Sequence, residues 1–313
     1  MKKKFYLPLG LAALALLGTG CTAEDPANGL DINQTIFADG EGGSSGSTEN
    51  PLTRYRISSY SFGYNRFEFD YTTSGIPVKC MQNRWSESNL DFEAKYDFEY
   101  GNGADYPTAV AWESTECPIW FNQERCGVIA NHKIENLEFE GGLLKSLIYS
   151  GKQVIVKVNG GEVVSDNMPL PAHNVKFEYD GAKHLVKIVV DSDVYDMKWN
   201  AAGDLVEVNS PYYGPSTIEY TNVENRYGQW DPTLPVMGFF QTYGWFGVAP
   251  THFPSKIKTC VLLNTNGSGG RAETASWYDL DYSIDYHGLI ETVKWSESLN
   301  NYTEARIDYQ YLQ

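Results

Sequence analysis

The chain has 313 residues, of which 42% are hydrophobic and 20% charged, with 24 Lys and Arg against 40 Asp and Glu. That length is enough for one large domain or two modest ones, and the apolar content excludes a wholly disordered chain. The net charge of −16 argues against nucleic-acid binding, because phosphate contacts require Lys and Arg.

The first 20 residues have the composition of a secretory signal. Three lysines precede an apolar run from Phe5 to Leu17, and small residues then lead to Cys21. This pattern predicts a lipoprotein signal peptide over residues 1–20, and its apolar run is too short to span a membrane stably. The position of Cys21 predicts lipid attachment there. The alternative is ordinary cleavage after Gly20, which leaves Cys21 as a free thiol.

Residues 21–54 hold few apolar side chains and are rich in Gly and Ser between positions 38 and 47. This composition is typical of a flexible linker, so we expect an acidic tether over 21–54. The alternative is a long loop of the folded domain. Loss of residues 1–20 removes three Lys and no acid, which leaves 21 basic against 40 acidic residues and a net charge of −19. Such a charge repels anionic surfaces, so an acyl chain would hold the protein to the membrane.

From Tyr55 onward the dominant hydrophobic period is two. Val175, Phe177 and Tyr179, for example, alternate with Lys176 and Glu178. In a strand, successive side chains point to opposite faces, so each such segment has one apolar and one polar face. This pattern favours antiparallel sheet with one face in water.

An aromatic-rich strand, a glycine-containing turn and a Leu-led strand recur along the chain, with Gly181 and Gly203 22 residues apart. Glycine accepts the positive φ of tight turns, so the repeat reads as successive β-hairpins. We therefore predict an all-β fold, an antiparallel β-meander of repeated hairpins. It would form a curved or barrel-like sheet as a single domain over 55–313.

The segment from Asn225 to Pro254 interrupts this pattern. It is rich in aromatic residues, Gly and Pro and has no clean hydrophobic period. We expect an excursion that carries a short helix near 236–243 and packs on the sheet.

With Cys21 acylated, four cysteines remain, an even number in an exported protein. Cys117 and Cys126 enclose a loop-sized insert, so we predict a disulfide between them first. Cys80 with Cys260 would follow, but both could equally be free, buried thiols. The sequence has no CxxC or HExxH, and we predict neither a metal nor a cofactor.

Exposed rings are the strongest candidates for a ligand site, because sugars bind by laying C–H groups on Trp or Tyr rings. The candidates are Trp245, Tyr243, Phe246, Tyr212 and Tyr213. The alternative for each is a place in the core or in a cross-strand pair.

No catalytic residue is predicted. His252, set between Pro250 and Pro254, is the most unusual histidine, and a structural role outweighs a catalytic one there. A glycosidase would use two carboxylates in a cleft, and Asp279, Asp281, Glu291 and Glu297 lie near tryptophans. The alternative for these acids is a solvated sheet face.

The sequence Gly18-Thr19-Gly20-Cys21 resembles the lipobox of bacterial lipoproteins. Glu24-Asp25 is similar to the surface-export signal of outer-membrane lipoproteins in gut-type Gram-negative anaerobes. With the hairpin repeat and the late Gly/Trp/Pro excursion, the chain resembles an uncharacterised lipoprotein domain family described as having a porin-like fold. The likeness is good over 130–313 and loose over 55–130. It implies a meander curled toward a barrel, with no assigned activity and no catalytic residue.

Lys187, Glu207 and Glu291 lie in predicted strands, which argues against a continuous lipid-facing band. We therefore expect a tethered domain of the outer membrane, displayed outside the cell, that acts as a binding or scaffold module. Its partner would be an extracellular glycan or an outer-membrane complex. Two alternatives stay open: an extracellular polysaccharide hydrolase with paired carboxylates, and a structural envelope lipoprotein.

Overall fold

The computed structural model describes residues 55–311, apart from 63–64, 87–88, 103, 122–123, 158–162, 212–213, 232–239, 241–242, 265–270, 286–287 and 299–300. The predicted signal (1–20) and tether (21–54), with the predicted acylation site Cys21, lie outside the described residues. Within the described part of the chain, no helix is long and apolar enough to cross a bilayer.

Antiparallel strands make up almost all the regular structure of the described residues. They are β1 (Tyr55–Phe62), β2 (Asn65–Tyr71), β3 (Pro77–Ser86), β4 (Asn89–Tyr100), β5 (Pro107–Phe121), β6 (Glu124–Glu140), β7 (Leu143–Lys157), β8 (Val163–Tyr179), β9 (Leu185–Val190), β10 (Asp193–Trp199), β11 (Leu205–Asn209), β12 (Gly214–Glu224), β13 (His252–Asn264), β14 (Arg271–Ile284), β15 (Ile290–Ser298) and β16 (Asn301–Tyr311).

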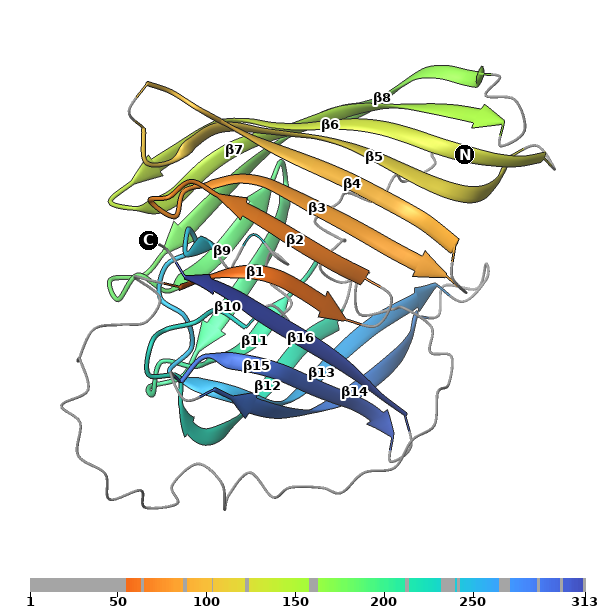
Figure 1. Cartoon of the computed structure of the whole chain (residues 1–313). Coiled ribbons are helices and arrows are strands. Elements are labelled where there is room, and N and C mark those ends of the chain that lie inside the picture. The colour runs from red at the N-terminus through yellow and green to blue at the C-terminus, as the bar shows by residue number, and fades with distance from the viewer. Residues whose placement is uncertain are drawn as a thin grey trace. The chain divides into compact units, whose positions relative to one another are not determined.

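Each strand neighbours the next along the chain, and β1 also neighbours β16, so the strand order closes into a barrel (Figure 1). This confirms the predicted all-β meander of hairpins. Of the two predicted forms, a curved sheet or a barrel, the structure has the barrel.

The alternation of apolar and polar residues in the sequence gives a strand such as β2 two different faces. In β2, Phe67 and Phe69 are buried, whereas Glu68 and Asp70 between them are exposed. Because side chains alternate in direction along a strand, β2 presents one apolar, buried face and one polar, exposed face.

The chain forms two compact units, each with its own core. Unit 1 contains residues 198–244 and 249–305, and unit 2 contains residues 56–197, 245–248 and 306–313. The fully buried side chains of unit 1 include Leu205, Ile257 and Leu289, and those of unit 2 include Leu144 and Leu185.

Five described turns share one backbone device, which accounts for Gly203 of the predicted glycine repeat but not for Gly181, because in that turn the positive-φ residue is Lys183. In each turn the fourth residue has positive φ, and its N–H donates to the backbone carbonyl of the first residue. The side chain of the first residue accepts a second hydrogen bond, from the N–H of the fifth residue. The turns run Thr72–Ile76, Asp180–His184, Asn200–Asp204, Asn225–Gln229 and Asp285–Leu289. Asp, Asn and Thr side chains favour such local bonds to the backbone, which is why these residues begin the turns.

The fourth residue of the Asp180–His184 turn is Lys183, at φ 69°, where the other four turns have glycine. A non-glycine residue is strained in this region, so Lys183→Gly is expected to stabilise the fold by about 0.5–1 kcal/mol. The urea unfolding midpoint measures this effect. Lys176→Gly, a control within β8, should destabilise the fold by a similar amount. A lower midpoint for Lys183→Gly would contradict the strain.

The excursion predicted at 225–254 is present between β12 and β13. Most of the range predicted to be helical, 236–243, lies outside the described residues; Phe240 and Tyr243 within it have single-turn 3₁₀ geometry. In unit 1, Asn225 holds the start of the excursion: its amide donates to the carbonyls of Gln229 and Pro250, at 2.8 Å each.

Candidate functional site

The predicted ligand-binding rings that the structure describes are mostly buried. Trp245 is 5% exposed and Phe246 1% exposed, while Tyr243 is half-buried and packs against Phe240. Phe246 lies against Phe177 of β8, with ring centres 5.4 Å apart. Trp245 and Phe246 thus occupy the core positions that the alternative interpretation expected. Tyr212 and Tyr213 lie outside the described residues.

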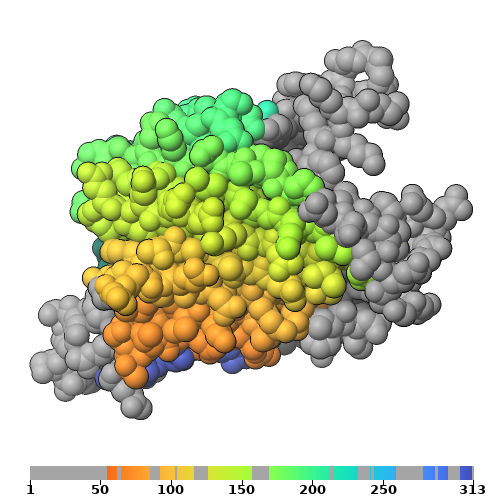
Figure 2. Space-filling view, turned by 90° about the horizontal axis from the view of Figure 1, so that it is seen from above, coloured from red at the N-terminus to blue at the C-terminus, as the bar shows by residue number. Residues whose placement is uncertain are grey.

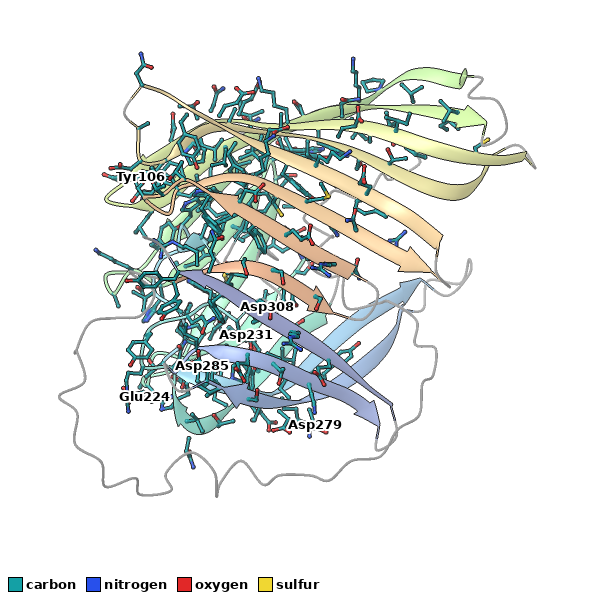
Figure 3. All side chains as sticks on the ribbon, in the orientation of Figure 1. Tyr106, Glu224, Asp231, Asp279, Asp285 and Asp308 are labelled. Carbon is teal, nitrogen blue, oxygen red and sulfur yellow. The ribbon has the colours of Figure 1, made fainter. Side chains whose placement is uncertain are left out.

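Trp245 supports a ring that does reach solvent. Its indole meets the ring of Phe139 edge-on at 5.7 Å, and Phe139 stacks on Tyr106 at 4.4 Å with 21° between the ring planes. Tyr106, directly before β5, is 36% exposed, and Figure 3 shows it at the end of the sheet where the β4–β5 turn lies. We call Tyr106, Phe139 and Trp245 the Tyr106 stack. All three belong to unit 2.

A second group of rings crosses the buried face of β4 to β8 in unit 2. Neighbouring ring centres along this row lie 4.8 to 6.5 Å apart, in the order Tyr96, Trp112, His132, Tyr149 and His173. The planes of neighbouring rings differ by 29° or less. The inner rings are covered by their neighbours on both sides, and Tyr96, Trp112 and Tyr149 are buried.

The polar atoms of this row also bind one another. His132 Nδ1 lies 2.6 Å from the Tyr149 hydroxyl, and His132 Nε2 lies 3.3 Å from Ser114 Oγ. Burial lowers the pKa of His132 to about 4, so its ring is neutral near pH 7. A neutral imidazole donates from one nitrogen and accepts at the other, which matches these two hydroxyl partners. In a catalytic triad a carboxylate would bind the second nitrogen of the histidine, after Ser114 binds the first. Here the Tyr149 hydroxyl takes that place, so the contacts of His132 are those of a structural network.

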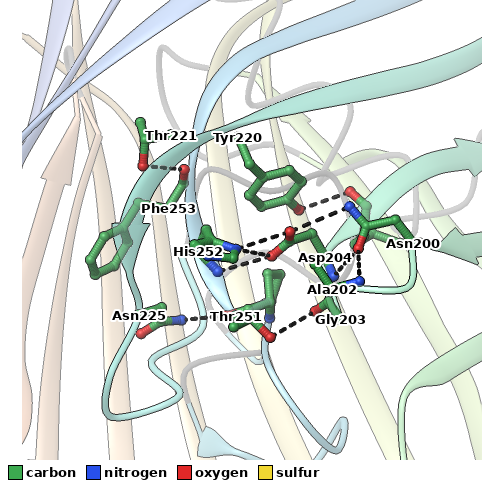
Figure 4. A network of polar contacts seen from close by, with 12 residues as sticks. Asn200, Ala202, Gly203, Asp204, Tyr220, Thr221, Asn225, Thr251, His252 and Phe253 are labelled. Carbon is green, nitrogen blue, oxygen red and sulfur yellow. Dashed lines mark hydrogen bonds and ion pairs between the residues drawn. The ribbon is translucent and has the colours of Figure 1, made fainter.

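The buried carboxylate of Asp204 anchors the end of the excursion in unit 1 (Figure 4). One of its oxygens accepts the backbone N–H of His252 at 2.9 Å, and His252 Nδ1 lies 3.0 and 3.1 Å from its two oxygens. Thr251 N–H donates to the Gly203 carbonyl at 3.1 Å, beside this pair. His252 therefore joins the excursion to the Asn200–Asp204 turn, which is the structural role expected for it.

The acids considered for a hydrolase lie on exposed strand faces where the structure describes them. Asp279 pairs with Lys256 at 3.1 Å, and Glu291 lies 3.5 Å from the Ser283 hydroxyl. The side chain of Glu297 lies outside the described residues. These positions match a solvated sheet face.

The exposed face of β4 to β7 carries a shallow hollow of about 550 Å³. It is lined by Asp97, Ala111, Trp112, Glu113, Asn131, His132, Lys133, Ser150, Gly151 and Lys152. Figure 2 looks onto this face. Asp97 already pairs with Lys79 and Lys133 with Glu135, so the hollow belongs to the ion-paired exposed surface.

Cys80 and Cys126 are buried, at 2% and 0% exposed. In the register Cys126 lies opposite Ile119. The side chains of Cys117 and Cys260, their predicted partners, lie outside the described residues, so the disulfide prediction remains for thiol titration to test. Among the described residues, no group of three or more His, Cys, Asp or Glu is placed to hold a metal ion.

The chain matches no family model and no curated protein in sequence. Among solved structures it is similar to a crystal structure of a porin-like protein from Bacteroides uniformis, determined at 2.32 Å resolution. The two chains are 8% identical, and the match covers 83% of this chain and 98% of that one with a TM-score of 0.47. Membership of the lipoprotein domain family stays a prediction.

Proposed function

We propose that this chain is a lipid-anchored binding module of the outer membrane whose barrel stands in water at the cell surface. The observation that carries this proposal is the distribution of charge over the strands. In the described strands the buried side chains are almost all apolar, and the charged side chains that form ion pairs between strands lie on the exposed faces.

Ion pairs are spread over the exposed strand faces of both units. In unit 2 they include Lys95–Glu93 at 2.8 Å and Lys187–Glu178 at 3.0 Å. In unit 1 they include Lys198–Glu207 at 2.6 Å, Lys256–Asp279 at 3.1 Å and Lys294–Glu304 at 3.5 Å.

A membrane-embedded barrel has the opposite distribution, with apolar side chains toward lipid and polar ones toward the lumen. A Lys or Arg on the lipid face near the bilayer centre costs about 2–4 kcal/mol. Apolar side chains that faced lipid would also be exposed when no bilayer is present, whereas Phe67, Phe69 and Val110 are buried in protein. The charge pattern therefore favours a water-exposed barrel, and acylation of Cys21 would provide the membrane attachment.

Two measurements test this proposal. The chain from residue 21 with Cys21→Ser, purified without detergent, should be monodisperse, show β-sheet circular dichroism and produce no conductance in planar bilayers. In cells, the full chain should incorporate labelled palmitate, and Cys21→Ser should abolish the label while Cys80→Ser, at a buried thiol, keeps it.

A requirement for detergent together with channel activity would show that the barrel is embedded. Labelling that survives Cys21→Ser would overturn the anchor. Protease treatment of intact cells then tests surface display, because a barrel that faces outward is digested while a periplasmic one is protected.

A further inference from the structure

We propose that the exposed face of the Tyr106 ring is a carbohydrate-stacking site for a neutral glycan. This inference rests on the proposed function, because it names the ligand class and the contact residue of the surface-exposed binding module. It rests on the geometry of the Tyr106 stack and on the charge around it.

The Tyr106 ring has one covered face and solvent access. Phe139 covers one face at 4.4 Å, and 36% of Tyr106 nevertheless remains exposed. The ring row of β4 to β8 differs in this respect, because Trp112 and Tyr149 within it are almost fully buried. Tyr106 therefore combines a ring that is packed on one side with exposed surface, which is the arrangement that a sugar needs for C–H contacts with the π-system.

The ring is also held in place before any ligand arrives. Behind Phe139, Trp245 packs edge-on against both Phe139 and Phe98, and its carbonyl accepts the N–H of Leu144 at 3.0 Å. A platform that is already ordered loses less conformational entropy on binding.

A glycine gives the Tyr106 hydroxyl its space. At Gly142, φ is +84°, and a Cβ built there would lie 3.1 Å from the hydroxyl oxygen of Tyr106. A side chain at this position would press on the ring. The β6–β7 turn therefore lies close to the Tyr106 hydroxyl and leaves no room for a side chain at this position.

The charge around the stack selects the ligand class. The residues next to the stack in the chain, Asp105 and Glu140, are both exposed, and the chain carries a net charge of −16. Glu140 pairs with Lys145 at 3.5 Å, whereas the exposed Asp105 can accept hydrogen bonds from sugar hydroxyls. The net negative charge repels carboxylated or sulfated polymers. The geometry and charge together point to a neutral hexose or pentose polymer.

The test is native affinity electrophoresis of the full-length protein solubilised from cells in mild detergent. The neutral probes are starch, xyloglucan and galactomannan, and the anionic probes are polygalacturonate and alginate. We expect retardation of the wild type in at least one neutral gel and in neither anionic gel. Tyr106→Ala should weaken that binding at least tenfold, and Tyr106→Phe, which keeps the ring, should stay within twofold.

Tyr311→Ala is the matched control, because Tyr311 belongs to the same unit, is 55% exposed and lies in β16. It should bind as the wild type does. Circular dichroism and thermal melting of each variant separate a lost contact from lost folding. If Tyr106→Ala folds incorrectly, Tyr106→Ser and competition by soluble oligosaccharide on the wild type provide the second readout.

The outcomes separate this inference from the proposed function. Retardation that is unchanged in a folded Tyr106→Ala protein overturns the site and leaves the binding module intact. Retardation in anionic gels alone overturns the neutral ligand class. No retardation in any gel overturns glycan binding, whereas detergent-free solubility and the absence of conductance would still support the water-exposed barrel.

Discussion

Replacing Trp245 with alanine is expected to lower the free energy of unfolding by about 3–5 kcal/mol, the range for a buried aromatic side chain in a core. Trp245 is 5% exposed and packs against Phe98 and Phe139. The truncation would leave a cavity within unit 2, beside Phe98 and Phe139. Urea unfolding followed by circular dichroism measures the loss.

Trp245→Phe is the paired control, because it keeps a ring in the same space and should lose less than half as much stability. Tyr311→Ala, at an exposed ring, should change stability by no more than about 0.5 kcal/mol. An unfolding midpoint of Trp245→Ala equal to that of the wild type would contradict the packing described. The same variant should weaken glycan retardation through loss of support for Phe139 and Tyr106, not through loss of a sugar contact.

Asp204→Ala is expected to destabilise the protein by about 2–4 kcal/mol, since it removes a buried acceptor from several donors at once. The Asp204 side chain is 4% exposed. Without its oxygens, the backbone N–H of His252 and the nearby amide of Asn200 lose their bonds to this side chain. Urea unfolding with an unchanged m-value measures the effect.

Asp204→Asn should lose less stability than Asp204→Ala, because the amide oxygen can still accept the backbone N–H of His252. Asp308→Ala provides the exposed comparison. Asp308 accepts the Ser59 hydroxyl at 2.7 Å on the exposed face, and its loss should cost less than about 1 kcal/mol. If Asp204→Ala and Asp308→Ala lost equal amounts of stability, burial of the Asp204 network would contribute nothing to the free energy of unfolding.

The strands were predictable because their signal is local. The alternation of Phe67, Glu68, Phe69 and Asp70, for example, predicts which side chains face the core. This prediction needs no information about the rest of the chain. The turns were predictable in part for the same reason. Gly203 has the positive φ expected of it, whereas in the Asp180–His184 turn Lys183 has it and Gly181 does not. The choice between a curved sheet and a closed barrel could not be predicted in this way. It depends on the pairing of β1 with β16, which are far apart in the sequence.

The candidate site was only partly accessible to sequence reasoning. The excursion that contains Trp245 stands out by its lack of a period, but the burial of Trp245 depends on Phe98 and Phe139, which are far away in the chain. Tyr106 was missed because Asp105-Tyr106-Pro107 reads as an ordinary turn. What makes Tyr106 notable is its stacking on Phe139, a contact that follows from the register of β4 to β7.

The pairing of β1 with β16 has a consequence for biogenesis. Every other neighbouring pair joins strands that follow each other in the chain, so those hairpins can form during synthesis or export. The pairing of β1 with β16 can form only after β16 has been synthesised and exported. A polypeptide that stops before β16 would leave β1 and β15 with unpaired backbone donors and acceptors, which invites association with other nascent chains. Quality control of this protein would therefore act on its final strand.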